Sequence, residues 1–277
     1  MILNKSKRIQ LVIFIALLAV LLIGVFLTGS NGSGGESIKE AMRDAVLHEE
    51  NRIPFLGGMT VNPGLISAFV VTGILLVFAA AMRLFVIPHF RDVPGKMQML
   101  LEMLVGYFDN LAKTNSPHRN VFLGAYVFGA GVYVAFSTIF ELFGLQAVAL
   151  SGRSMSLPAP LSDINGAIAM GVVSYLVILS GGIVSNGIRG VGSTLKEFSL
   201  PISMSFRLFG AMLSGLLVTE LVYAYLMISF VLPVFVAVMF TLLHALIQTY
   251  VLTMLTALFY GEVSEPHAKK GKKVAKQ

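Results

Sequence analysis

Cysteine and tryptophan are absent from this chain, and charged residues are scarce, at 12% of 277. Without cysteine the chain has neither a disulfide framework nor a thiolate metal site. Without tryptophan, any aromatic belt at a membrane surface must consist of tyrosine and phenylalanine. A water-soluble domain carries roughly a quarter charged residues, whereas 56% of this chain is hydrophobic. The composition therefore indicates a polytopic membrane protein.

Motifs of catalysis and nucleotide binding are also lacking. The sequence contains no glycine-rich nucleotide-binding motif, no His-x-x-x-His pair and no Gly-x-Ser-x-Gly turn. Such motifs bind phosphates or metals, or present a nucleophile. We therefore expect no catalytic residue, no metal site and no cofactor.

Six apolar segments are each long enough to cross about 30 Å of hydrocarbon. They cover residues 9–28, 64–87, 121–147, 164–187, 201–228 and 231–260. Only helices and closed barrels satisfy the backbone in lipid, and these runs are too long and too uniformly apolar for barrel strands. We predict an all-α polytopic membrane protein with about six membrane-spanning helices and no β-strands.

Lysine and arginine are distributed unevenly between the connections. If the N-terminus is cytoplasmic, fifteen of the 20 lie on the inner side, one lies within the fifth segment, and only four lie outside: Lys39, Arg43, Arg52 and Arg153. Cytoplasmic connections of membrane proteins carry such an excess. Both termini are therefore predicted to be cytoplasmic. The net charge of +6 is explained by membrane topology, and no nucleic-acid partner is expected.

The sequence divides into four predicted parts. Residues 1–28 are a membrane span or a signal-like segment, and we favour a span because the apolar run is longer than a typical signal core. Residues 29–63 form an outer-side loop, in which residues 36–50 are expected to be a short surface helix. Residues 64–267 form the membrane domain, and residues 268–277 are a basic cytoplasmic tail.

Residues 92–113 differ from the spans because their apolar residues follow helical spacing among polar ones. Asp92 and Pro94 suit a helix start, and Lys96, Glu102 and Asp109 lie among the polar positions. The pattern predicts an amphipathic helix at the cytoplasmic surface, which can equally be a packed connector between spans.

Arg207 is the most informative residue, because it lies inside a long apolar stretch. Between residues 198 and 260 the only formal charges are Arg207 and Glu220. An arginine at the bilayer centre costs roughly 2.5–3.5 kcal/mol on insertion scales and about 10–17 kcal/mol in simulations of an isolated helix. A guanidinium does not lose its proton to escape this cost. A carboxylate or water must therefore reach Arg207, and both arrangements indicate a functional site.

Acidic residues are predicted at similar depth near the outer ends of three spans. They are Glu141, Asp163 (with Asn165 beside it) and Glu220. Together they predict an acidic, hydrated entrance for a cation. Two simpler interpretations stay open: Asp163 also suits a helix N-cap, and Glu141 also suits the membrane interface.

Polar residues of the fifth and sixth segments fall on two helical stripes. These stripes are formed by Ser203, Arg207 and Ser214 and by Thr241, His244 and Gln248. The short connection between the segments predicts an antiparallel hairpin, which puts the second stripe near the depth of the first. Such a histidine or glutamine usually forms an interhelical hydrogen bond. Opposite an intramembrane arginine, an ion path is the alternative, since imidazole changes charge near neutral pH.

Several stretches of the chain resemble subunit a of the F-type ATP synthase membrane sector (Fo). The stretch Val-Pro-Gly-Lys-Met-Gln at 93–98 resembles the family's Pro-Gly-Lys-Leu-Gln, and Asp163 with Asn165 resembles its Asp-x-Asn helix start. Residues 201–215 resemble its Pro-x-Ser-x-x-x-Arg-Leu-Phe-Gly-Asn-Met-x-x-Gly block. Gln248, 41 residues after Arg207, and the ending at 259–267 also match. The resemblance covers roughly residues 60–267.

The resemblance implies a static, non-catalytic subunit beside a rotating ring of c subunits. The b-subunit peripheral stalk, other ATP synthase subunits and the lipid bilayer of a bacterial-type plasma (inner) membrane would be further partners. H⁺ or Na⁺ would pass through two half-channels to and from the ring carboxylates, and so couple ion flow to rotary ATP synthesis. The expected ion-translocation residues are Arg207, Gln248, His244 and Glu220. The half-channel candidates are Glu141, Asp163, Asn165, Ser203, Ser214, Thr241 and Glu197.

The chain departs from the family pattern at three positions. Ala211 stands where the family usually has asparagine, Leu216 where many members have an acid, and Ser193 where another acid is often found. Glu220 follows Leu216 by about one turn, and Glu197 follows Ser193 by about one turn. Each is a candidate substitute for the missing acid.

Two other functional classes compete with this interpretation. A secondary transporter would use Arg207 to bind an anionic substrate, and would be indicated by inverted repeats or broken helices in both halves. A structural membrane subunit would pair Arg207 with another helix.

Overall fold

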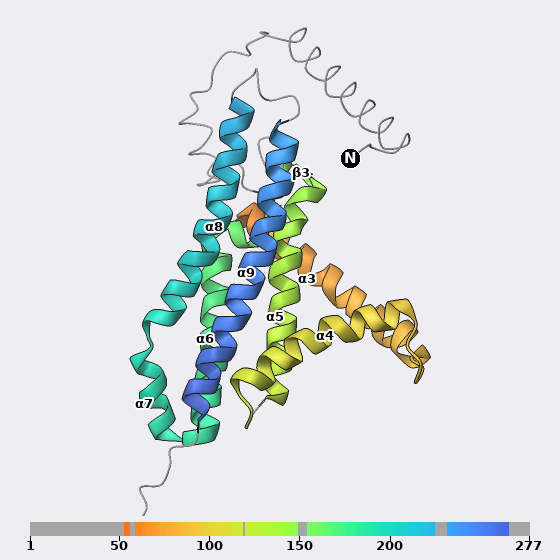
Figure 1. Ribbon diagram of the computed structural model, residues 1–277. Helices are drawn as coiled ribbons and strands as arrows, with labels where there is room; N and C mark the ends of the chain where they lie inside the picture. Colours follow the sequence, from red (N-terminus) through yellow and green to blue (C-terminus); the bar gives the residue numbers. More distant parts are fainter. Residues whose placement is uncertain (1–52, 56–58, 119, 149–153, 225–231, 266–277) are drawn as a thin grey trace, which may run out of the picture.

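The computed structural model describes residues 53–55, 59–118, 120–148, 154–224 and 232–265. The predicted first span (9–28), the surface helix (36–50) and the basic tail (268–277) lie outside these described residues. Within them the chain is mostly helical, and most of the long helices lie side by side in a bundle (Figure 1).

Five of the six predicted spans are long helices. They are α3 (Pro63–Ala81), α5 (Val121–Phe140), α6 (Ile164–Asn186), α8 (Ser199–Ala224) and α9 (Leu232–Ser264). α3 continues through η1 (Met82–Val86) and η2 (Ile87–His89), and α5 continues through η3 (Glu141–Phe143). Among the residues that the structure describes, four helical stretches are long and apolar enough to cross a membrane, and they belong to α3, α5, α6 and α9.

Two short β-hairpins show that the prediction of no strands is wrong for the connections. β1 (Ile53–Phe55) pairs antiparallel with β2 (Met59–Val61) before α3. β3 (Gln146–Val148) pairs antiparallel with β4 (Ser154–Ser156) between α5 and η4 (Pro160–Ser162). The prediction considered only backbone in lipid, whereas both hairpins lie outside the long apolar helices, where water can satisfy the outer edge of each strand.

Side-chain caps begin two of the spanning helices. At α3, Asn62 Oδ1 accepts a hydrogen bond from Gly64 N at 2.9 Å, and Pro63 occupies the first helical position, where no intrahelical donor is needed. At α6, Asp163 Oδ1 accepts from Asn165 N at 3.1 Å. The N-cap interpretation of Asp163 is therefore confirmed.

The predicted amphipathic helix is α4 (Lys96–Asn115), but it begins later than Asp92 and Pro94 suggested, because its N-cap is Gly95. The chain before it is held by Gln98, whose Oε1 accepts from Arg91 N at 3.1 Å and whose Nε2 donates to Arg91 O at 2.9 Å. Phe108 and Ala112 are buried, whereas the apolar residues of the first half are mostly exposed. Only the second half of α4 is therefore a packed connector.

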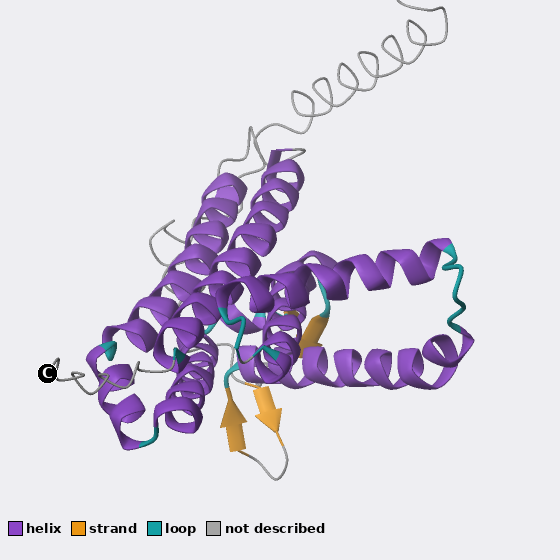
Figure 2. Cartoon of the chain, turned by 60° about the horizontal axis from the view of Figure 1, so that its bottom comes forward, coloured by secondary structure: helices purple, strands orange, loops and turns teal. Residues whose placement is uncertain are grey.

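The core lies where α5, α6, α8 and α9 meet. α9 lies against α5, α6 and α8, and α6 also lies against α8. The side chains between them are apolar and buried, for example Val127, Ile178, Leu208 and Leu252. α3 and α4 extend away from this bundle as an arm, which both views show (Figures 1 and 2).

The outer surface of the helices is also apolar. Val77 is 71% exposed, Leu84 66%, Leu246 73% and Phe69 60%. Water-soluble monomers rarely expose contiguous apolar surface of this extent. Together with the four apolar helices, this surface indicates that the bundle lies in a membrane.

A short helix, α7 (Ile188–Lys196), folds back against the end of α6. Gly187, with φ of 59°, makes the turn between the two helices in a conformation that favours glycine. The helices then touch through backbone, because a Cβ on Gly190 would overlap the carbonyl group of Gly182. The start of α8 depends on this contact, since α8 follows α7 almost directly.

We expect Gly190→Ala to destabilise the protein, because the added methyl group must force α7 away from α6. Gly192→Ala is the matched control in the same helix, since no atom beyond its chain neighbours and the adjacent backbone of its own helix lies within 4 Å of the position of its Cβ. There the change should be neutral or should stabilise by about 0.4–1 kcal/mol through the unfolded chain. Thermal unfolding of the purified protein in detergent measures both. Equal midpoints for the two variants would contradict the close contact.

Candidate functional site

Arg207 lies on the exposed side of α8. Pro201 occupies the first turn of this helix, where proline is tolerated, and Met204 and Leu208 turn inward into the core. Ser203, Arg207 and Ser214 are all exposed, as the predicted stripe requires. Among the side chains that the structure describes, no carboxylate forms an ion pair with Arg207. The charge of Arg207 is therefore not neutralised within the described part of the chain.

The polar stripe of α9 faces the protein. Thr241 and Gln248 are buried, and His244 is half-buried with its ring 5.8 Å from that of Phe240. Gln248 Oε1 is buried and has no hydrogen-bond partner among the described residues. An orphaned buried acceptor costs about 1–3 kcal/mol. Gln248 Oε1 thus does not form the predicted interhelical hydrogen bond with any described residue.

A small cavity joins α5, α8 and α9 beside His244. Its volume of about 10 Å³ is close to the space that one water molecule needs. Three helices supply its lining, which consists of Thr138, Glu141, Met212, Gly215, Phe240, Thr241 and His244. The structure therefore brings together three predicted site residues, Glu141, Thr241 and His244.

His244 lies beside Gly215 of α8. A Cβ at this position would lie 3.6 Å from His244 Nδ1, which is an ordinary van der Waals distance, so the imidazole ring is close to α8 at this point. Leu216, where the family often has an acid, follows directly. In this chain a titratable group on α9 thus lies against the part of α8 where that acid would be.

Thr138, Met212 and Phe240 line the cavity but were missed by sequence reasoning. Thr138 is three residues before Glu141, on the same face of α5, and its Oγ1 donates to Val134 O at 2.8 Å. That spacing was a usable signal for Thr138. Met212 and Phe240 are apolar, and their role depends on packing between helices that the sequence does not reveal.

Asp163 and Asn165 lie apart from this cavity, since neither lines it. Asp163 caps α6 and packs against the first turn of α3, where a Cβ on Gly64 would lie 2.9 Å from Asp163 Cβ. Asn165 Nδ2 donates to Asp163 Oδ1 at 3.3 Å. Both residues therefore have a structural role at the junction of two helices.

The other two acids lie toward opposite ends of α8. Glu220 belongs to this helix, but its side chain lies outside the described part of the structure. Glu197 follows α7 as its C-cap; its backbone N donates to Thr194 O at 3.0 Å, and its carbonyl oxygen accepts from Leu200 N at 2.9 Å. The half-buried Glu197 thus sits at the turn into α8.

Comparison with known proteins gives a consistent result. The family model of the ATP synthase A chain matches residues 65–261. The chain is similar to ATP synthase subunit a of Cereibacter sphaeroides, with 26% identity over 63% of this chain and 72% of the relative. Subunit a of Histophilus somni is 27% identical, over 60% and 73%. Subunit a of Acidothermus cellulolyticus is 30% identical, over 61% and 65%.

Gln248→Leu should leave the free energy of unfolding unchanged or raise it, because the variant removes a buried acceptor that has no partner among the described residues. The matched control is Asn186→Leu, which loses the bonds from Nδ2 to Val263 O at 3.0 Å and Glu265 O at 2.9 Å. The control should lose about 1–3 kcal/mol. Chemical unfolding in detergent compares them, and an equal loss in both variants would show that Gln248 Oε1 has a bonding partner.

Proposed function

We infer the function of this chain from its family, because the chain belongs to the ATP synthase A chain family. We propose that Arg207 is the fixed charge past which a rotor ring carries its ion-binding carboxylates. Membership makes the chain a non-catalytic, ion-translocating stator subunit of the ATP synthase membrane sector. The c-ring, the b-subunit stalk and the plasma membrane with cytoplasmic termini belong to the proposal. A transporter of anionic substrates has no support from these relatives.

The exposure of Arg207 is the observation that carries this proposal. An unneutralised guanidinium on the surface of a membrane helix needs a partner, and the described side chains supply none. A carboxylate on another subunit fits, because it can approach the exposed side of α8 and leave again. A fixed partner within this chain would instead hold Arg207 in a static ion pair.

A nearby cation accounts for ion release. It lowers the pKa of a carboxylate by about 1–3 units and so favours the charged, empty form. The neutral, loaded carboxylate can face lipid, whereas the charged one cannot do so without a large desolvation cost. Arg207 thus lets the empty site pass and repels H⁺ and Na⁺, which prevents a direct leak between two half-channels.

The cavity beside His244 supports a path for ions from the outer side. Glu141 follows α5 at the end that the proposed orientation puts on the outer side, and it lines the cavity together with Thr241 and His244. We propose that Glu141, His244, Thr241 and Glu220 belong to the outer half-channel. Glu197 and Ser203, near the other end of α8, belong to the inner one. The transmembrane potential then supplies about 2.3 kcal/mol per charge per 100 mV.

Arg207→Ala should abolish ion-driven ATP synthesis, and Arg207→Lys should impair it severely, because an ammonium can lose its proton where guanidinium does not. Arg91→Ala is the control, since Arg91 is exposed in the connection before α4. The rates are measured in vesicles that contain the whole complex. Near-normal synthesis by Arg207→Ala would refute the proposed role.

Apolar replacement of His244 or Glu220, and Glu141→Gln, should slow passive ion flux through the membrane sector and shift its pH profile, since each change removes a titratable group from the path. Glu102→Gln on the exposed face of α4 is the matched control. Flux is followed in vesicles with an imposed potential. Unchanged flux in all three variants would remove these residues from the outer half-channel.

A further inference from the structure

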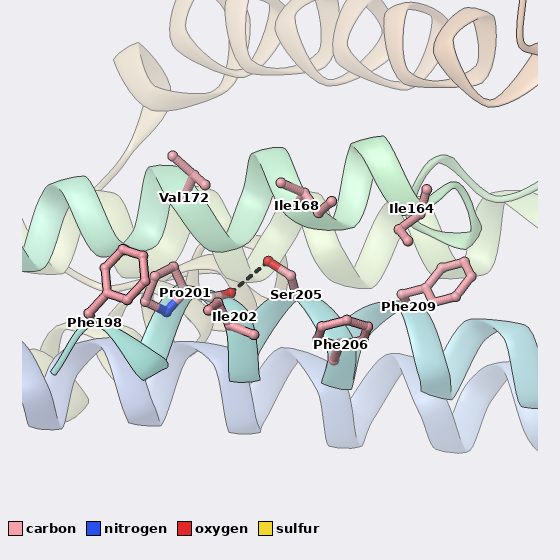
Figure 3. A pocket seen from close by; sticks show the side chains of 9 residues that line it. All are labelled: Ile164, Ile168, Val172, Phe198, Pro201, Ile202, Ser205, Phe206 and Phe209. Carbon is pink, nitrogen blue, oxygen red and sulfur yellow. Dashed lines mark hydrogen bonds between the residues drawn. The ribbon is translucent and has the colours of Figure 1, made fainter.

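An apolar groove runs along the outside of the bundle between α6 and α8 (Figure 3). Its volume is about 270 Å³. One wall consists of Ile164, Ile168 and Val172, which are successive turns of α6, and the other is formed by α8 and the residue before it, with Phe198, Ile202, Phe206 and Phe209. None of these residues has a role in the proposed ion path.

The floor of the groove offers no polar group to a ligand. Ser205 Oγ, the one side-chain polar atom there, donates to Pro201 O at 2.7 Å within its own helix. The same two residues touch Gly171, so the two helices meet in close contact behind the groove. An occupant therefore gains only by burying apolar surface.

The walls are exposed to the surroundings of the protein at membrane depth. Ile168 is 46% exposed, Ile202 48% and Phe206 64%, and α6 is one of the four membrane-capable helices. Since the surroundings are hydrocarbon, the occupant is a lipid chain or a helix of another subunit. A helix with its side chains is about 10–12 Å across, whereas a cavity of about 150 Å³ holds benzene. A groove of this size fits about one acyl chain.

A basic residue lies where the groove begins. Phe198 forms one end of the groove in Figure 3, and the exposed Lys196 precedes it by two residues at the end of α7. Two residues span at most about 7 Å. Glu197, between them, is half-buried, so the ammonium group of Lys196 is the more accessible charge at this corner. Basic sites beside membrane helices on the cytoplasmic side bind anionic headgroups, and the charge distribution places Lys196 on that side.

We propose that this groove is a binding site for an anionic phospholipid of the inner leaflet, with one acyl chain between α6 and α8 and the headgroup phosphate at Lys196. The inference rests on the proposed orientation of the chain, with cytoplasmic termini, and not on the role of Arg207. Its two parts are separable, because the groove provides affinity for the chain and Lys196 provides preference for the negative headgroup.

The test uses the whole complex in phosphatidylcholine vesicles that contain phosphatidylglycerol with a photoactivatable acyl chain. After illumination, mass spectrometry should find the label on residues 164–172 and 198–209 in excess over the equally apolar, exposed surface of α3. Unlabelled phosphatidylglycerol should compete better than phosphatidylcholine. Label spread evenly over all exposed apolar surfaces would overturn the site, and crosslinks from the groove to a helix of another subunit would identify that helix as the occupant instead.

Two pairs of variants sharpen the result. Ile168→Trp should remove the label from the groove, whereas Val173→Trp, at a residue equally exposed at 46% but outside the groove, should retain it. Lys196→Gln should reduce the preference for phosphatidylglycerol about fivefold, the ratio expected for one basic residue near the surface. Lys96→Gln should not reduce it. Equal labelling of the two tryptophan variants would refute the acyl-chain site, and an unchanged preference in Lys196→Gln would refute the headgroup contact.

Discussion

A guanidinium on a helix within a membrane keeps its charge, so its surroundings must either solvate it or neutralise it. α8 meets this constraint by dividing its surface. Met204 and Leu208 anchor one side in the core, and Arg207 lies on the other side, open to whatever adjoins the bundle. The bundle fixes the position of the charge without supplying a described partner, which suits a charge that acts on a moving carboxylate.

The polar groups of α9 complement this arrangement from the protein side. Gln248 has a buried oxygen atom that no described group pairs with, and His244 lies half-buried beside Gly215. Polar groups of this kind reduce stability when they lack partners. The position of His244 beside a cavity of about one water molecule is explained if water or an ion visits it.

The elements of this fold could be predicted from hydropathy, because membrane-spanning helices are long, uniform and apolar. The two β-hairpins could not, since strands of three residues leave no periodic pattern. The site was predicted in part. The polar stripes on α8 and α9 are visible as helical spacing, but the meeting of Glu141 with His244 depends on how α5 packs against α9, and residues 103 positions apart carry no local signal for that contact.

Asp163 is a residue for which the sequence left two roles open. A carboxylate at this position suited an ion entrance and a helix cap equally, and the hydrogen bond that it accepts from Asn165 N identifies the cap. Glu220 carries no such observation, so its place in the path stays a prediction. The distribution of lysine and arginine predicted on which side of the membrane Lys196 lies. The neighbouring groove could not be predicted, because it is formed by the packing of α6 on α8.

Two adjacent faces of α8 have different surroundings, and this limits which changes of sequence the helix can accept. Arg207 and Phe206 are neighbours in the chain, yet one belongs to the open polar stripe and the other to the apolar groove. Each residue advances a helix by about 100° and about 1.5 Å. One inserted residue between Pro201 and Phe206 would therefore move Phe206 into the place of Arg207, and Arg207 into the buried place of Leu208. Substitution of one apolar side chain by another is tolerable in this segment, whereas its length is not free to vary.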